Sequence, residues 1–248
     1  MAAISLKLFK KLFNTPEKQE EFLDRRRADR YTLGTGFPLQ AIDPISKFNY
    51  EIATISTLGM GLKAGKNSPS NELKKIKLQL EDFEVNLPLN VKNSKEFDTN
   101  TVLGIELEFE NMNQKMDYHQ ILLPVIIGST LKEMSPEMVN QNESGFHKRI
   151  FKSSDSAYLT LRYIKDGDAS IPKNFEFEFE CFDLRGTTQD YSLEIFNIEK
   201  SQNKSSHLLN KNSNQNDRKE MFKLFFWTVQ NMQKNLEPDI RKYLANFR

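Results

Sequence analysis

The fold is decided by residues 23–61, which read LDRRRADRYTLGTGFPLQAIDPISKFNYEIATISTLGMG. The stretch opens with a basic run, Asp24-Arg25-Arg26-Arg27-Ala28-Asp29-Arg30. It closes with a small polar turn, Thr54-Ile55-Ser56-Thr57-Leu58-Gly59-Met60-Gly61. Near this turn the apolar residues alternate with polar ones, at Phe48, Tyr50, Ile52, Met60 and Leu62. Period-two alternation predicts two strands joined by the turn.

The two ends of this stretch carry groups that suit a planar ligand bearing phosphates. An arginine offers five donors in a fixed fork, which match two phosphate oxygens or the O6/N7 edge of guanine. Its flat guanidinium also stacks on a purine face. Ser56 adds a hydroxyl that donates and accepts, and Gly59 and Gly61 let the backbone approach a ligand closely. No acid–base pair, nucleophile or metal-ligand cluster accompanies them in the sequence, so binding is predicted rather than catalysis.

Each feature also has a plain structural interpretation. Consecutive arginines commonly form a solvated surface turn, since charge runs need no ligand. Gly59 and Gly61 can equally be turn or bulge glycines between two strands. The occurrence of both features in one stretch favours a binding site.

The motifs of this stretch are similar to those of a known family. The run Arg25-Arg26-Arg27-Ala28-Asp29-Arg30 is a complete Arg-Arg-x-x-x-Arg motif, and Thr54-Ile55-Ser56-Thr57-Leu58-Gly59 matches Asp/Asn-x-Ser-x-x-Gly except at Thr54. Further on, residues 104–112 look like that family's late strand. Residues 23–134 therefore resemble the PilZ family, bacterial receptors for cyclic di-GMP (c-di-GMP).

The resemblance implies a six-stranded antiparallel β-barrel with a closing helix, and a ligand site in front of it. Arg26 and Arg30 would hold the phosphates and guanine edges, Arg25 or Arg27 would support them, and Ser56 and Gly59 would line the floor. At Thr54 the family's carboxylate or amide acceptor is replaced by a hydroxyl. The loss of one acceptor costs about 1–3 kcal/mol, or one to two decades in affinity. The expected ligand-binding residues are Arg25, Arg26, Arg27, Arg30, Thr54, Ser56 and Gly59.

The pattern beyond Gly61 independently favours a small antiparallel barrel. Alternation continues through residues 76–80, 83–91 and 105–109, which with the earlier strands makes some six short strands. Pro88 is expected at an edge or a break, and residues 92–100 are expected to form a hairpin-like loop. The apolar run in residues 117–134 predicts a buried helix with Pro124 in its first turn.

The second half again has strands followed by a helix. Strands are expected at Leu159–Tyr163, Phe175–Cys181 and Tyr191–Ile195, with solvated glutamates on one face and Cys181 in the core. Residues 201–216 are expected to be a mobile loop, and a helix capped by Asp217 is expected to run to residue 235. Its apolar stripe continues to residue 247, and a second sheet or another subunit must cover it. The expected organisation is α+β and mainly β, with N-terminal helices in 1–22, the barrel in 23–134, and a second β-rich, degenerate PilZ-like domain in 145–248.

Composition limits the compartment and the partners. The 248 residues carry 35 basic and 34 acidic side chains, a net charge of +1, which argues against a general nucleic-acid coat, DNA or an anionic membrane as the main partner. One cysteine excludes an internal disulfide, and no apolar run approaches the ~20 residues of a transmembrane helix. A cytoplasmic protein without metal or cofactor is expected.

Two functions follow as hypotheses. The first is a c-di-GMP receptor that changes conformation, or its docking to a downstream protein, when the dinucleotide binds. The alternative is a degenerate barrel that serves as a ligand-independent protein–protein interaction or assembly module. That alternative predicts homo-oligomers formed through the C-terminal helix, residues 222–247. An enzyme is not expected.

Overall fold

The computed structural model describes residues 28–65, 73–165, 171–189, 191–200, 207–211, 214–232 and 236–247. The predicted helices of residues 1–22 and the predicted ligand residues Arg25, Arg26 and Arg27 lie outside these ranges. Contacts divide the chain into two compact units, residues 1–125 and 126–248. The division falls inside helix α3 (Met112–Thr130). Each unit is described by itself.

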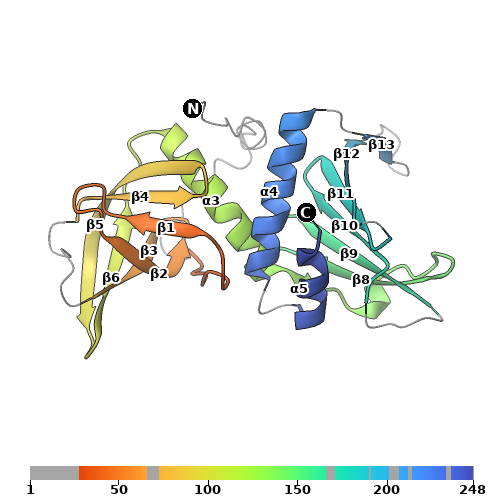
Figure 1. Cartoon of the computed structure of the whole chain (residues 1–248), viewed down its shortest axis with the longest axis horizontal. Helices are drawn as coiled ribbons and strands as arrows, with labels where there is room; N and C mark the ends of the chain where they lie inside the picture. The colour runs from red at the N-terminus through yellow and green to blue at the C-terminus, as the bar shows by residue number, and fades with distance from the viewer. Residues whose placement is uncertain are drawn as a thin grey trace. The chain divides into compact units, whose positions relative to one another are not determined.

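The first unit contains a closed barrel of six antiparallel strands (Figure 1). Around the barrel the strands follow the order β1-β2-β3-β6-β5-β4, and β4 closes it by pairing with β1. The predicted six-stranded antiparallel barrel is therefore confirmed. The strands are β1 (Leu39–Ile42), β2 (Asn49–Ser56), β3 (Gly59–Gly65), β4 (Lys75–Leu80), β5 (Phe83–Glu96) and β6 (Asn100–Leu107).

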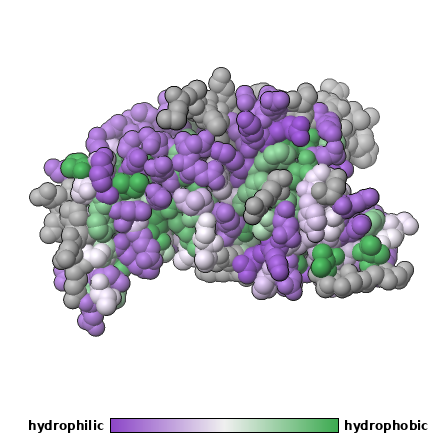
Figure 2. Space-filling model, in the orientation of Figure 1, coloured by the Kyte–Doolittle hydropathy of each residue, from purple (hydrophilic) through white to green (hydrophobic). Residues whose placement is uncertain are grey.

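Alternation of side chains explains the barrel. In β4, Ile76, Leu78 and Leu80 are fully buried, while the residues between them face outward. In β6, Leu103, Ile105 and Leu107 are buried in the same way. Period two sends one set into the closed interior and the other to solvent. Hydrophilic side chains accordingly cover most of the described barrel surface on the face shown in Figure 2.

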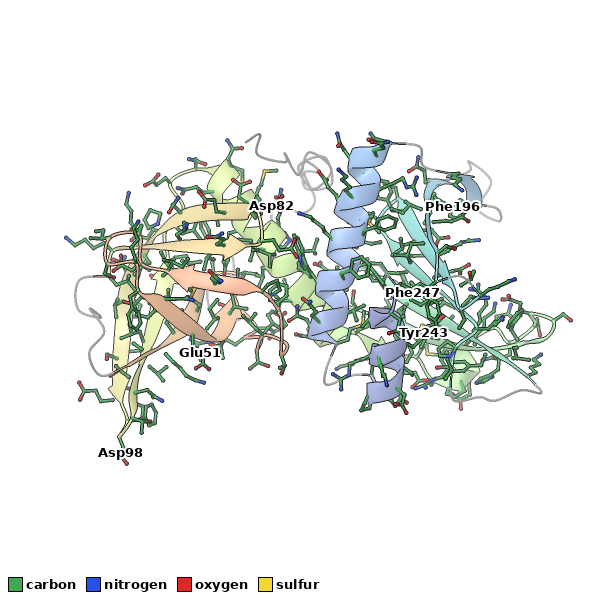
Figure 3. The ribbon with its side chains drawn as sticks, viewed as in Figure 1. Glu51, Asp82, Asp98, Phe196, Tyr243 and Phe247 are labelled. Carbon is green, nitrogen blue, oxygen red and sulfur yellow. The ribbon has the colours of Figure 1, made fainter. Side chains whose placement is uncertain are left out.

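Strand β5 is longer than the sequence predicted. It pairs with β4 as far as Pro88, opposite Lys75, and then with β6 from Leu89, opposite Leu107. Pro88 thus lies where one partner strand gives way to the next, as its missing N–H allows. The expected loop at residues 92–100 is wrong, because β5 continues to Glu96 and its hairpin with β6 turns at Asp98 (Figure 3). Both faces of this extension are exposed, so no alternation marks it in the sequence.

Helix α3 is buried, as predicted, but begins earlier. Its first turn is capped by the Asn111 side chain, which accepts from the Gln114 N–H at 3.0 Å. Pro124 therefore lies inside the helix and not in its first turn. The prediction erred because residues 112–117 are mostly polar and only Met112 and Met116 among them are apolar, so the continuous apolar run begins later. Many apolar side chains of α3 are almost fully buried, among them Ile121, Leu122, Leu123, Val125 and Ile127.

The second unit contains a seven-stranded antiparallel sheet in which sequence neighbours pair, from β13 to β7. Helices α4 (Gln215–Asn231) and α5 (Pro238–Ala245) lie on one face of it (Figure 1). This confirms the expected second β-rich part that ends in a long helix. The strands are β7 (Lys132–Glu133), β8 (Phe146–Lys152), β9 (Tyr158–Ile164), β10 (Asn174–Phe179), β11 (Phe182–Thr187), β12 (Leu193–Lys200) and β13 (His207–Lys211).

The apolar stripe of the C-terminal helices is covered by this sheet. The Phe225 ring stacks on Phe175 of β10 with centroids 4.9 Å apart, and Phe247 meets the same ring edge-on at 4.9 Å. Tyr243 and Phe247 lie side by side at the end of the chain (Figure 3). Of the two covers that the sequence left open, the sheet of the same chain is the one observed.

Several local predictions for this unit were wrong. Cys181 is exposed rather than buried, because Glu180 and Cys181 form the turn between β10 and β11, with Glu180 at φ 57°. Glu176 is not solvated but lies between Arg162 and Arg185, at 2.8 and 3.2 Å. Asn214, not Asp217, caps α4, its side chain accepting from the Asn216 N–H at 3.0 Å. Part of the expected mobile loop, residues 207–211, is strand β13 paired with β12.

Candidate functional site

The end of the arginine run is tied to the end of β2. Tyr31 forms an isolated antiparallel bridge with Ile55, in which each backbone N–H donates to the other residue's carbonyl at 2.8 Å. Arg30 precedes Tyr31, and Ser56 follows Ile55. Because the two segments of the chain run antiparallel here, the bridge brings Arg30 beside Ser56, although these residues are far apart in sequence.

Arg30, Ser56 and Gly59 line one hollow of about 190 Å³. Arg30 is exposed, and within the described part of the chain it forms no ion pair. The floor of the hollow is the outer face of the barrel, since the buried neighbours Leu103 and Leu107 place Gly104 and Glu106 outward. The lining residues are Ala28, Arg30, Ser56, Leu58, Gly59, Lys92, Asn93, Gly104, Ile105 and Glu106.

The Ser56 hydroxyl is fixed in the β2–β3 turn. Its Oγ donates to the Gly59 carbonyl at 3.0 Å, and the residue is 7% exposed. The Ser56 carbonyl accepts from the Tyr118 hydroxyl of α3. Burial raises the pKa of Tyr118, so this phenol keeps its proton and stays a donor. With its own proton engaged, the Ser56 oxygen can offer a ligand only its acceptor lone pairs.

Gly59 is required by close packing of two strands. A Cβ on Gly59 would lie 2.1 Å from the Ile105 carbonyl oxygen and 3.2 Å from its carbon. Both atoms belong to the backbone of β6, which cannot move aside as a side chain could. Gly59 is itself buried, because the β6 backbone fills the space that its side chain would take, and it contributes only backbone to the hollow.

Thr54 lies one pair of residues away from Ser56 along β2. It is paired with Gly61, and its Oγ1 is 2.9 Å from the position that a Gly61 Cβ would take. Thr54 is not among the residues that line the hollow. Gly104, paired with Gly61, is covered from the other side by Asn93, whose side-chain oxygen is 2.3 Å from the Cβ position. Thr54 and Asn93 thus cover adjacent glycines from opposite sides.

Sequence reasoning missed the side of the hollow formed by β5. Lys92 and Asn93 were expected in a loop, and Glu106 was expected only as part of the strand in residues 104–112. Lys92 is the extra residue of a β-bulge, since the register with β6 shifts between Val91 and Asn93. Lys92 Nζ and Glu106 Oε2 are 2.7 Å apart. Nothing in the sequence predicts the register that brings these residues to the site.

A second, larger hollow of about 750 Å³ adjoins the first. The two share Leu58, Lys92 and Glu106. Lys115 of α3 also lines it, and partial burial lowers the pKa of that amine. The lining contains the amines of Lys92 and Lys115 and the carboxylates of Glu106 and Glu108. The other lining residues are Leu58, Asn90, Leu107, Phe109, Asn111 and Met112.

The described ranges contain no group of three or more His, Cys, Asp or Glu side chains that could hold a metal ion. None of the helices described has the length and hydropathy needed to cross a bilayer.

Comparison with known proteins gave matches to solved structures alone. No family model and no curated protein matches the sequence. Structures of c-di-GMP-binding proteins resemble it. The MrkH–c-di-GMP complex of K. pneumonia aligns at 20% identity and TM-score 0.36, over 42% of this chain and 53% of MrkH. A second structure of MrkH, a c-di-GMP-dependent transcription regulatory factor, aligns at 21% identity and TM-score 0.33, over 41% of this chain and 51% of MrkH.

A third similar structure covers more of the chain. The PlzA protein of Borreliella burgdorferi in complex with c-di-GMP aligns at 9% identity and TM-score 0.32, over 84% of this chain and 98% of PlzA. The aligned part of this chain spans about half the length of the MrkH chains.

Proposed function

We propose that the first unit is a receptor for cyclic di-GMP that binds the dinucleotide on the outer surface of its barrel. The observation that carries the proposal is the single hollow lined by Arg30, Ser56 and Gly59. These residues come from two motifs separated in sequence, and the Tyr31–Ile55 bridge brings the motifs together. Both motifs contain the groups that a phosphorylated guanine compound requires.

The chemistry of the hollow suits one base of the dinucleotide. Its volume of about 190 Å³ is below the range of pockets that enclose a drug-sized ligand. A guanine held in the hollow could receive hydrogen bonds from Arg30 at its O6/N7 edge or at the adjoining phosphate. Among the described residues, Arg30 forms no ion pair with a carboxylate.

Arg25, Arg26 and Arg27 would complete the site from the segment before Arg30. In this proposal Arg26 joins Arg30 on the phosphates and guanine edges, and Arg25 or Arg27 supports them. Because these residues precede the barrel, contacts with the ligand would fix the segment and shift residues 1–22. That shift, or a changed docking of the second unit to a downstream protein, would be the output. Thr54 would weaken the site without removing the arginine contacts.

Titration calorimetry with cyclic di-GMP tests the proposal. Arg30→Ala is expected to weaken binding about 10–100-fold, because a hydrogen bond to a charged group contributes about 1.5–3 kcal/mol. Lys77→Ala is the matched control. It also removes one cation from the barrel, but Lys77 lies on β4, outside the residues that line the hollow, and pairs with Glu84 at 3.3 Å. The control is expected to bind as the unchanged protein does.

Two results would contradict the proposal. Absence of heat at tens of micromolar dinucleotide would argue strongly against a receptor. An Arg30→Ala variant that binds as tightly as the unchanged protein would show that the site lies elsewhere.

An assembly module is the second candidate, and the threonine at position 54 favours it. In this candidate, copies of the chain were expected to associate through the apolar stripe of residues 222–247. Phe225, Ile240 and Phe247 of that stripe are almost fully buried within the second unit. An oligomer would therefore need another surface. Light scattering without dinucleotide tests this candidate, which predicts a stable oligomer.

A further inference from the structure

Ser56 and Glu106 face each other across a glycine on the outer surface of the barrel. The strand register pairs Ser56 with Gly59, and Gly59 with Glu106. Neighbouring strands lie about 4.8 Å apart, so two spacings separate the two backbones by about 9.5 Å. Gly59 places no side chain between them. A base held in the hollow would therefore have Ser56 and Arg30 at one edge and Glu106 at another.

Glu106 does not stand alone at its edge. The Lys92 ammonium is 2.7 Å from its carboxylate, with side chains 54% and 38% exposed respectively. The bulge in β5 places Lys92 here, and both side chains line the hollow with Arg30. An exposed ion pair of this kind contributes little to stability. The pair offers an acceptor and a donor side by side.

Guanine has the complementary groups on its Watson–Crick edge. Its N1–H and N2 amino group are adjacent donors, and O6 beside them is an acceptor. A carboxylate can accept from both donors at once, while an ammonium donates to O6. Adenine presents an N1 acceptor and no amino group at C2, so a carboxylate at this edge would meet a lone pair. A mismatch of this kind discriminates strongly.

We propose that Glu106 determines base specificity, by accepting from the N1–H and N2 amino group of a guanine whose O6 accepts from Lys92. The inference rests on the proposed function and extends it.

Electrostatic repulsion predicts the direction in which the affinity would change if Glu106 made no specific contact. Cyclic di-GMP carries two negative charges, and a carboxylate in the hollow repels them. Removal of Glu106 would tighten binding if the side chain acted only through its charge. Weaker binding after its removal would therefore require a specific contact.

The experiment compares Glu106→Gln with the unchanged protein in calorimetric titrations against cyclic di-GMP and its inosine analogue, which lacks the N2 amino group. The unchanged protein is expected to prefer cyclic di-GMP about 10–100-fold. In Glu106→Gln this preference is expected to fall to about threefold, through weaker binding of cyclic di-GMP. The variant should still bind the inosine analogue within about tenfold of the unchanged protein, which would report an intact site.

Glu84→Gln is the matched control. Glu84 is a surface glutamate of β5 that pairs with Lys77 at 3.3 Å and does not line the hollow. Its loss changes the net charge equally and should leave both affinities unaltered. If Glu106→Gln keeps the full preference, or binds cyclic di-GMP more tightly, the assignment of Glu106 is overturned while the receptor function stands. If the unchanged protein binds neither dinucleotide, the proposed function fails and this inference with it.

Discussion

Replacing Gly59 with alanine is expected to lower the free energy of unfolding of the barrel by about 3 kcal/mol or more. The new methyl group would lie 2.1 Å from the Ile105 carbonyl oxygen. Relief requires β3 and β6 to move apart, which strains the seven residue pairs from Gly59↔Glu106 to Gly65↔Asn100. Thermal unfolding followed by far-ultraviolet circular dichroism measures the effect, which should be a fall of roughly 10 °C in the barrel's melting temperature.

Gly65→Ala is the control for this prediction. Gly65 ends the same strand, and a Cβ there would have no atom within 4 Å. Alanine restricts the unfolded chain more than glycine does, so this variant should be equal to the unchanged protein or more stable by up to about 1 kcal/mol. If Gly59→Ala has the same melting temperature as Gly65→Ala, the close approach of β3 and β6 is contradicted.

Gly59 also illustrates what the sequence could predict. The motif around Ser56 predicted a bare floor beside a hydroxyl, and alternation predicted the strands on either side. These features are local, because a turn and its flanking strands are encoded within a few residues. The neighbouring strand that makes Gly59 necessary, β6, is far along the chain. The register of β6 against β3 is a property of the closed barrel, and the sequence around Gly59 does not predict it.

The missed half of the hollow has the same origin. Lys92 and Asn93 lie where β5 is exposed on both faces, so its strand character leaves no alternation in the sequence. A bulge then changes which side chains face the site. In the second unit, the misplacement of Cys181 arose because the alternation Phe175-Phe177-Phe179 was extended two residues into a turn. The first error thus reflects a tertiary constraint, and the second reflects a local turn that the alternation does not mark.

Phe225→Ala is expected to lower the free energy of unfolding of the second unit by about 3–5 kcal/mol. Phe225 is fully buried in α4, and its ring stacks on Phe175 at 4.9 Å and lies 5.4 Å from Phe177. Removing it leaves a cavity between helix and sheet and also removes the ring–ring contacts. The single tryptophan, Trp227, lies in the same helix and is 3% exposed. Its fluorescence in a urea titration therefore reports the loss of this packing.

Phe222→Ala provides a control in the preceding turn of α4. This ring is only partly buried and lies 6.0 Å from the Arg218 guanidinium. Its removal should cost about 1 kcal/mol. The pair of variants also separates the two functions considered for the chain. If the stripe is core, Phe225→Ala lowers stability and leaves the mass measured by light scattering unchanged. If instead the stripe holds a second copy of the chain, the same substitution should lower that mass with a smaller effect on unfolding, and the packing of α4 against β10 would be contradicted.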